Sequence, residues 1–409
     1  MSLIVQKYGG TSVADAEKIK NVAKRIAWTK DEGKQVVAVV SAMADTTDDL
    51  LELAKKVSEQ PNRRELDVLL STGEVVSSTL LAMALHSMGY RAVSLSGAQA
   101  GIKTDMAYSR ARIMQIDPKR VIKELEKGNI VIVAGFQGIT DEMDITTLGR
   151  GGSDTTAVAL AASLGAEACQ IYTDVEGVYT ADPRLVPEAL KLDEIGYDEM
   201  LEMATYGAKV IHSRAVELGE LFNVPILVAS SFNLNPGTLI HAEESMEVRN
   251  KVRGIAHDLD VAKITVVGVP DHPGIAAAIF VPLAEAGISV DTIVQNASME
   301  RITDLTFTVA KSQLTAAMDV VEPIAESIGA RECVSDSRLG KVSIIGTGMQ
   351  NAPGYASRMF SSLSEEKVNI QLISTSEIRI TCIIGEDSIK DAVRALHRAF
   401  ELEIDEQPG

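Results

Sequence analysis

The sequence predicts an α/β protein whose larger part is a three-layer αβα sandwich built on a mostly parallel sheet. Two observations predict it. Over residues 1 to about 240, short β-branched runs alternate with segments of helical period, as when LIVQKYGG precedes ADAEKIKNVAKRIAWTKDEG. From Ile264 onward a different pattern occurs twice, and each copy is expected to fold in the order βαββαβ.

The strands of the first part are expected to be buried, because each run is continuously apolar. The runs are LIVQKYGG, QVVAVVSAM, YRAVSLSG, NIVIVAGFQG, ACQIYTDVEGVY and VPILVASSF. In parallel sheets, ligands collect beyond the carboxyl ends of the strands, which here carry GG, SAM, GFQG and TDVEG. These ends favour a phosphate or small-molecule site.

The stretch TTLGRGGSDTTAVALAASLGA, residues 146–166, places Arg150, Ser153 and Asp154 in a glycine turn before a helix. One interpretation is a tight connection in which Ser153 or Asp154 caps the helix. The other is a seat for an anion, because free N–H groups and the helix dipole favour negative charge there.

A domain boundary is expected near residue 245, where NPGTLIHAEESMEVRNK becomes charged. The two later copies share Pro-Gly at an offset of 80, as Pro273 and Pro353 show. The predicted domains are residues 1–245, 263–335 and 341–405, the last two with strands that they could share. Pro282 falls inside the helix expected after Gly274 and should kink or shorten it.

The composition excludes several classes of partner. With 39 basic and 57 acidic residues the net charge is −18, which argues against nucleic acid and against an anionic membrane surface. The three cysteines and six histidines are scattered, so neither a disulfide framework nor a zinc site is expected, which suits the cytoplasm. We expect no signal peptide, and no apolar run of the ~18–20 residues that a membrane span needs.

Seven motifs stand in one order along the chain: KYGGTS, SAM, TGE, GFQG, GRGGSD, TDVEGVYTADPR and YGAKVIH. In this order, the first 240 residues resemble the catalytic domain of aspartate kinase, a member of the amino-acid-kinase superfamily. The C-terminal pair resembles tandem ACT domains, which sense ligands in that enzyme. The resemblance spans essentially the whole chain, and implies an amino-acid kinase fold followed by two ferredoxin-like ACT domains.

The resemblance implies ATP-dependent phosphorylation of the L-aspartate β-carboxylate, with Mg²⁺, to give 4-phospho-L-aspartate for lysine, threonine and methionine biosynthesis. The chemistry is consistent with the residues, because a β-carboxylate with a pKa near ~3.9 is already ionised and needs no general base. No GxxxxGK[ST] sequence is present, so a P-loop enzyme is excluded.

The implied catalytic residues are Lys7, Asp154 and Lys209. Lys7 would stabilise the transferring phosphoryl group, Asp154 would orient the lysines and help position Mg²⁺, and Lys209 would reach the nucleotide phosphates. No metal site is expected to be fixed by the protein alone. Without the resemblance, Lys7 could be a surface lysine and Asp154 a helix cap.

For the amino acid, the resemblance implies that Arg150 binds the α-carboxylate and Glu74 the ammonium, with Ser41, Thr47 and Ser153 as further contacts. Glu74 could instead lie in the first turn of a helix, where a negative charge interacts favourably with the helix dipole, and Ser41 or Thr47 could be helix caps. For the nucleotide, it implies Lys7, Gly9, Gly10, Thr173, Asp174, Tyr179, Asp182, Pro183, Arg184 and Lys209. Viewed alone, ADPR is an ordinary proline-containing turn.

The ACT resemblance implies lysine and/or threonine as effectors and a homo-oligomer formed through these domains. The implied effector residues are Asp271, Pro273, Gly274, Ala276 and Gln295 in the first copy, and Met349, Asn351, Gly354, Ser374 and Thr375 in the second. Because Asp271 supplies a charge for an ammonium and Asn351 does not, we expect the first copy to bind more strongly. Alternatively, both copies are structural dimerisation modules. Met246 could also start a separate C-terminal subunit.

Other functions remain open. A sister kinase that makes an acyl phosphate from glutamate or acetylglutamate is one, although a blocked amine would not need Glu74; uridylate kinase would not need an amino-acid clamp. A non-catalytic amino-acid sensor is another, but it would be expected to have lost Lys7, Asp154 or Arg150. A fused homoserine dehydrogenase is not expected, because the chain stops soon after the second ACT copy.

Overall fold

The structure is a computed structural model that describes residues 2–242, 252–296, 302–349 and 353–404. Contacts divide the chain into two compact units. The first unit is Met1–Tyr179 with Lys191–Glu247, and the second is Thr180–Leu190 with Val248–Gly409. The short segment Thr180–Leu190 thus belongs with the C-terminal part of the chain, although the sequence motif that contains it begins in the first unit.

The first unit is built on an eight-stranded sheet of order β10-β12-β11-β9-β1-β2-β6-β3. Its strands are β1 (Leu3–Tyr8), β2 (Gln35–Val40), β3 (Ala92–Leu95), β6 (Ile130–Ala134), β9 (Ala168–Thr173), β10 (Glu194–Gly196), β11 (Ile226–Ser230) and β12 (Thr238–His241). All neighbours pair in parallel except β11 and β12. This confirms the predicted mostly parallel sheet.

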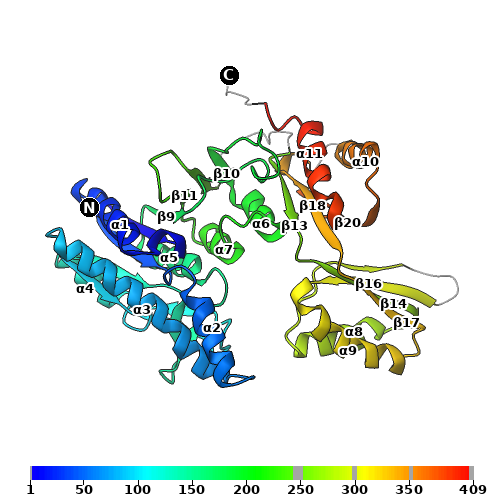
Figure 1. Cartoon of the computed structure of the whole chain (residues 1–409), viewed down its shortest axis with the longest axis horizontal. Helices are drawn as coiled ribbons and strands as arrows, with labels where there is room; N and C mark the ends of the chain where they lie inside the picture. Colours follow the sequence, from blue (N-terminus) through cyan, green and yellow to red (C-terminus); the bar gives the residue numbers. More distant parts are fainter. Residues whose placement is uncertain (1, 243–251, 297–301, 350–352, 405–409) are drawn as a thin grey trace. The chain divides into compact units, whose positions relative to one another are not determined.

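Helices cover both faces of this sheet. α1 (Ala16–Asp31) and α3 (Arg63–Ser87) lie on one face (Figure 1). Their buried side chains form one cluster with alternate residues of β2 such as Val36 and Val40. On the other face, α5 (Gly152–Leu164) contacts β1, β2 and β9 and also packs against α7 (Ser213–Leu221). The remaining helices of the unit are α2 (Thr46–Val57), α4 (Lys119–Glu126) and α6 (Tyr197–Tyr206).

α3 is the one helix of the described residues that is long and apolar enough to cross a membrane, contrary to the expectation from the sequence. Half of its most apolar stretch is buried inside the protein, and the helix packs against α1, β3 and β6. Its buried face also carries the carboxylates of Asp67 and Glu74. These contacts make α3 a core helix of the first unit.

A second, small sheet has the strand order β5-β4-β7-β8, and two of its strands, β7 and β8, follow β6 in the chain. The sequence analysis did not predict this sheet. Its strands are β4 (Ile102–Thr104), β5 (Ile113–Ile116), β7 (Gln137–Ile139) and β8 (Ile145–Thr147). β8 leads directly into the glycine turn before α5, so this sheet sets where that turn begins.

The second unit contains two four-stranded sheets. The first comprises β14 (Ala262–Pro270), β15 (Ile293–Gln295), β16 (Ile302–Val309) and β17 (Glu332–Asp336), with α8 (Ile275–Glu285) and α9 (Leu314–Ser327) beside it (Figure 1). Apolar side chains of both helices and of the sheet share one core with the buried Phe307. Its chain order is the predicted βαββαβ. Pro282 lies in the last turn of α8, and the helix continues to Glu285, so the proline does not cut it short.

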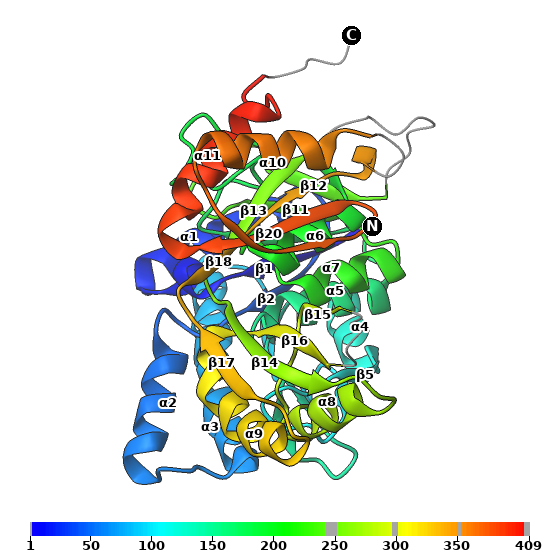
Figure 2. The same ribbon diagram turned by 90° about the vertical axis from the view of Figure 1, so that its right-hand side faces the viewer.

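The second sheet corrects the predicted order. Its own copy supplies β18 (Leu339–Ile345), α10 (Tyr355–Glu365), β19 (Ile370–Thr375), β20 (Arg379–Gly385) and α11 (Ile389–Ala399), in the order βαββα. The fourth strand is β13 (Gly254–Asp258), which precedes both copies and pairs antiparallel with β18. Because an open edge leaves N–H and C=O groups unpaired, β13 takes the place of a final strand. Figure 2 shows α10 and α11 side by side against this sheet.

Direct contacts join the two sheets of the second unit. Lys263 donates a hydrogen bond of 2.6 Å to Gln371, and Lys341 pairs with Asp291. Val261, Leu339, Leu372 and Ile383 form one apolar cluster. These contacts lie within one compact unit, which contains both copies.

Candidate active site

An ion pair between Lys7 and Asp154 marks the carboxyl end of the parallel sheet. Lys7 is the second-last residue of β1, and Asp154 lies in the first turn of α5. The Lys7 Nζ atom is 2.6 Å from the Asp154 Oδ1 atom, with 11% and 12% of the two side chains exposed. A lysine fixed in this way is a preorganised cation, which is what a phosphoryl group requires.

The glycines after β1 let the backbone approach this pair closely. A Cβ on Gly9 would lie 3.5 Å from the Lys7 Nζ atom, in van der Waals contact, so the Gly9 backbone lies beside this atom. A Cβ on Gly10 would lie 2.8 Å from the Ala42 carbonyl oxygen, which leaves room only for glycine. The first two strand ends, KYGG and SAM, are therefore in contact.

The turn before α5 differs from the capping interpretation. Gly151, with φ of 69°, occupies the N-cap position, and no side chain caps the helix, so neither Ser153 nor Asp154 has that role. Both lie inside the first turn, where N–H groups lack intrahelical acceptors. A Cβ on Gly135 would lie 2.8 Å from the Ser153 Oγ atom, so GFQG packs on GRGGSD.

Glu74 occupies the middle of α3, not the first turn of a helix, because Asn62 caps the helix and it begins at Arg63. The side chain is 3% exposed. Its Oε1 atom accepts a hydrogen bond of 3.1 Å from the Ala42 N–H group, whereas Oε2 is buried without a hydrogen-bond partner among the described residues. Burial raises the pKa of Glu74 to about 7. A buried acceptor without a donor is costly, and a cationic ligand group would satisfy it.

The other predicted amino-acid contacts lie in the same unit as Glu74. Ser41 follows β2, and its carbonyl oxygen accepts a hydrogen bond of 2.7 Å from Ser77, one turn beyond Glu74. Thr47 lies in the first turn of α2, whose N-cap is Asp45, so neither Ser41 nor Thr47 is a cap. Arg150 is exposed and forms no ion pair with a described residue, which leaves its guanidinium available to a carboxylate.

The predicted nucleotide residues divide between the two units. Thr173 ends β9, and its hydroxyl donates to Asp174; Tyr179 pairs with Lys191 across an isolated bridge, still in the first unit. The other three, Asp182, Pro183 and Arg184, lie in the segment that belongs to the second unit.

Two of the predicted nucleotide residues, Arg184 and Lys209, have cationic side chains, the kind that bind phosphate. Arg184 forms a bidentate pair with Asp182, with contacts of 2.7 and 3.0 Å, and this hydrogen bonding lowers the pKa of the Asp182 carboxyl. Lys209 is exposed between α6 and α7.

The predicted effector residues lie at corresponding turns of the two copies. Gly274 and Gly354 are the N-caps of α8 and α10, with φ of 95° and 109°, a conformation that favours glycine. In the first copy, Asp271 and Pro273 are exposed before α8, Ala276 is in its first turn, and Gln295 ends β15. In the second, Met349 is buried, and Ser374 and Thr375 end β19. Asn351 and Met246 lie outside the described residues.

Two residues that sequence reasoning missed hold the glycine turn. Arg214 donates hydrogen bonds of 2.7 Å to the Leu148 carbonyl and 3.1 Å to that of Ala111. A Cβ on Gly151 would come 2.3 Å from the His212 Cβ atom, so that ring packs on the turn. Their signal was the IHSR stretch directly after YGAKV, but nothing in the sequence showed which way these side chains point.

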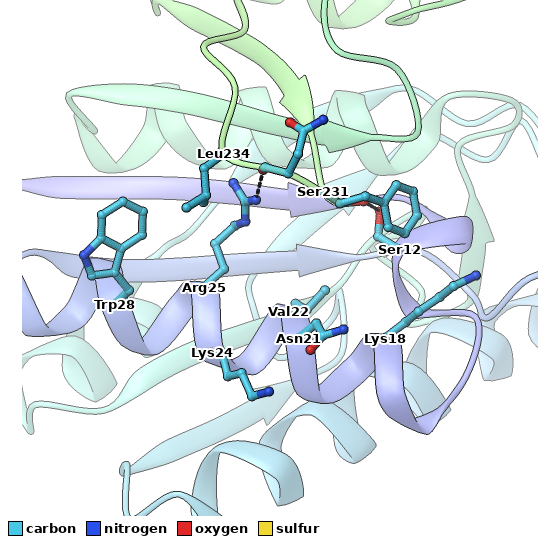
Figure 3. A pocket seen from close by; sticks show the side chains of 11 residues that line it. Ser12, Lys18, Asn21, Val22, Lys24, Arg25, Trp28, Ser231 and Leu234 are labelled. Carbon is cyan, nitrogen blue, oxygen red and sulfur yellow. Dashed lines mark hydrogen bonds between the residues drawn. The ribbon is translucent and has the colours of Figure 1, made fainter.

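A cavity of about 460 Å³ lies outside these residues, between α1 and the segment after β11 (Figure 3). Its lining includes Lys18, Lys24, Arg25 and Trp28, and none of the predicted catalytic or binding residues. Arg25 already donates a hydrogen bond to the Asn233 carbonyl and lies 4.5 Å from the Tyr172 ring centre. The cavity therefore does not carry the chemistry of the Lys7–Asp154 pair.

Comparison with known proteins shows the family of each part of the chain. Residues 2–230 match the amino acid kinase family, and residues 264–323 and 342–400 match the ACT domain. An aspartate kinase of Stutzerimonas stutzeri is 53% identical over 98% of both chains, and an aspartokinase of Pseudomonas aeruginosa is 51% identical over all of both.

Solved structures of aspartokinases are also similar to this chain. The E. coli aspartokinase III complex with aspartate and ADP is 26% identical, with a TM-score of 0.80 over 98% of this chain and 100% of that one. The complex of the same enzyme with lysine and aspartate gives a TM-score of 0.73 at 26% identity, over 97% and 99% of the two chains. The chain belongs to the aspartate kinase family, in which an amino acid kinase domain is followed by tandem ACT domains.

Proposed function

We propose that this aspartate kinase binds the ammonium of L-aspartate at Glu74 and the α-carboxylate at Arg150, and transfers the γ-phosphoryl group of ATP to the β-carboxylate. The product is 4-phospho-L-aspartate. The observation that carries the substrate assignment is the buried Glu74 Oε2 atom, which has no hydrogen-bond partner among the described residues. An ammonium donor on the substrate would remove that cost.

The transfer needs no general base, because a carboxylate with a pKa near ~3.9 is already ionised at neutral pH. In phosphoryl transfer the charge spreads over the equatorial oxygens, so catalysis depends on positioned cations and N–H donors. Lys7 supplies the cation, and its 2.6 Å contact with Asp154 fixes the direction of Nζ. The first-turn N–H groups of α5 supply donors.

Mg²⁺ is proposed to accompany the nucleotide. Among the described residues, no group of three or more His, Cys, Asp or Glu side chains could hold a metal ion. Mg²⁺ binds through one or two carboxylates plus substrate phosphates in such enzymes, and Asp154 is the carboxylate placed beside Lys7. The ion would neutralise phosphate charge.

The nucleotide is proposed to contact Lys7, Gly9 and Gly10 with its phosphates, and Thr173, Asp174 and Tyr179 of the same unit with its nucleoside. The ADP complex of E. coli aspartokinase III supports a nucleotide in a relative of this fold. Lysine and/or threonine are the proposed effectors at the ACT turns, a role that the lysine complex of the same relative supports. A cytoplasmic homo-oligomer that associates through the ACT domains is part of the same proposal.

The test is an ATP-dependent hydroxamate assay on aspartate, glutamate and N-acetylglutamate, with and without lysine plus threonine. We expect turnover of aspartate alone, because N-acetylglutamate has no ammonium for Glu74 and glutamate is one methylene longer. Lys7→Met should abolish turnover, whereas Lys20→Met, which removes an exposed lysine paired with Glu17, should not change it. Turnover of glutamate but not aspartate would overturn the substrate assignment, and binding of aspartate without turnover would support an amino-acid sensor.

A further inference from the structure

Asp67, in α3, is a fully buried carboxylate that forms no ion pair with a described residue. Four donors surround it. Its Oδ2 atom accepts the N–H groups of Ser109 at 2.9 Å and Thr147 at 2.8 Å. Its Oδ1 atom accepts the hydroxyls of the same two residues, at 3.2 and 2.9 Å. A buried charge persists only when it is hydrogen-bonded in this way, so the position is built around a carboxylate.

Both residues that donate to Asp67 shape the turn that carries Arg150. Thr147 ends β8, three residues before Arg150. Ser109 has φ of 69°, which is rare for a serine, and a Cβ on Gly149 would lie 3.0 Å from its carbonyl oxygen. Asp67 therefore fixes the last residue of the strand that leads into the turn, and the segment that packs against Gly149.

The same helix carries Glu74, seven residues further on. Seven residues are about two helical turns, so Asp67 and Glu74 lie on one face of α3, about 10 Å apart along its axis. Between them, the Ser71 carbonyl accepts a hydrogen bond of 2.8 Å from Gln137, the first residue of β7. One face of α3 thus holds β7, the start of the turn after β8, and the Ala42 N–H group that Glu74 accepts.

We propose that Asp67 is a positioning residue that holds the Arg150 turn at a fixed separation from Glu74. A single amino-acid substrate then meets the guanidinium with its α-carboxylate and Glu74 with its ammonium at the same time. Asp67 touches no ligand itself. This inference rests on the roles proposed above for Arg150 and Glu74. By this proposal, Asp67 influences the affinity of the enzyme for the amino acid and does not influence its affinity for ATP.

The hydrogen bonds suggest a matched pair of variants. In Asp67→Asn, the amide oxygen can take the place of Oδ2 and accept both N–H groups. The NH₂ group can then donate to both hydroxyls, because a hydroxyl is donor or acceptor. All four contacts survive without the charge. In Asp67→Ala all four are lost, and the N–H groups of the buried Thr147 and the half-buried Ser109 lose their acceptor.

The readout is the KM for aspartate and the KM for ATP, with thermal unfolding as the check on folding. We expect Asp67→Ala to raise the KM for aspartate at least tenfold and that for ATP less than twofold, and Asp67→Asn to restore both within threefold. Glu124→Ala is the control, because Glu124 is a buried carboxylate of α4 that accepts from Lys127 and Asn129 and touches none of the site. It should lower the unfolding temperature and leave both KM values unchanged.

A folded Asp67→Ala enzyme with an unchanged KM for aspartate, or with both KM values raised equally, would overturn the proposal. If Asp67→Ala does not fold, the double variant Ser109→Ala/Thr147→Val decides, because it removes only the two hydroxyl donors. It should raise the KM for aspartate at least threefold, and no change would count against Asp67. If the wild type turns over a different amino acid, the proposed substrate is wrong, and the same ranking of variants is then measured on that amino acid.

Discussion

We predict that Glu74 lowers the free energy of unfolding of the ligand-free protein and that the same side chain binds the substrate. Burial raises its pKa from the usual 4.5 to about 7, and one of its oxygens has no hydrogen-bond partner among the described residues. We therefore expect Glu74→Gln to weaken aspartate binding while it removes a destabilising group. Effects of opposite sign on stability and on activity are expected where a group that destabilises the free protein is kept to bind a ligand.

The sign and size follow from the pKa. The folded state holds a proton on Glu74 up to about pH 7, whereas the unfolded chain loses it near 4.5. Stability is therefore lost as the pH rises from 4.5 to 7, by up to about 3 kcal/mol, and stays lower above that range. Glu74→Gln lacks this loss, so its stability relative to the wild type should increase between pH 5 and pH 8.

Activity should change in the opposite direction. A hydrogen bond to a charged group contributes about 1.5–3 kcal/mol, so the kcat/KM for aspartate should fall about 10- to 150-fold. Deprotonation near pH 7 should also lower the wild-type KM for aspartate about tenfold between pH 6 and pH 8, and the variant should lack this dependence.

The assays are urea unfolding at pH 5 and pH 8 and initial rates across the same range. Glu124→Gln is the matched control: hydrogen bonding from Lys127 lowers the pKa of Glu124, so its loss should destabilise the protein without changing the KM. The reasoning fails if Glu74→Gln shows the same stability difference from wild type at both pH values, or if it retains the wild-type KM for aspartate.

Three further outcomes are expected. Lys7→Met should lower kcat at least ~10³-fold, because the loss of a preorganised cation affects the transition state most, while calorimetry should still detect the binding of aspartate. The substitution should also leave the Asp154 carboxylate without its ion-pair partner. A kcat within tenfold of the wild-type value would contradict the role proposed for Lys7. Gly10→Ala should impair folding or nucleotide affinity, since its Cβ would meet the Ala42 carbonyl oxygen at 2.8 Å, and a variant with unchanged unfolding temperature and KM for ATP would refute this. Asp271→Ala should raise the half-inhibitory concentration of lysine or threonine at least tenfold, and an unchanged inhibition curve would argue against an effector ammonium at this exposed carboxylate.

The parallel sheet was predictable because its strands are buried on both faces and so read as uninterrupted apolar runs. QVVAVV became β2, in which all but the first residue are buried. The small sheet was not predictable, because β4, β7 and β8 have three residues each, too few to show a period. Yet this sheet supplies Thr147, and with it the start of the turn that carries Arg150.

The helix that carries Glu74 was misplaced for a physical reason. The sequence analysis allowed Glu74 to lie in the first turn of a helix, but Glu74 and the preceding Gly73 are both inside α3. A Cβ on Gly73 would lie 2.8 Å from that of Ala42, so glycine is needed there for close packing and not for a turn. Gly73 packs against Ala42, which is 31 positions earlier in the chain, and the residues next to Gly73 in the sequence do not reveal such a contact.

The segment Thr180–Leu190 shows where motif and structure divide the chain differently. By motif, it continues TDVEGVY, the predicted nucleotide loop, yet its partners lie in the second unit. The Thr180 carbonyl accepts a hydrogen bond of 2.7 Å from Ile255, its hydroxyl is 2.9 Å from His397 Nε2, and Arg394 donates to the Leu185 carbonyl at 2.7 Å. β13 and α11 of the ACT pair thus fix the conformation of Asp182, Pro183 and Arg184. Glu74 and Arg150, by contrast, both lie in the first unit.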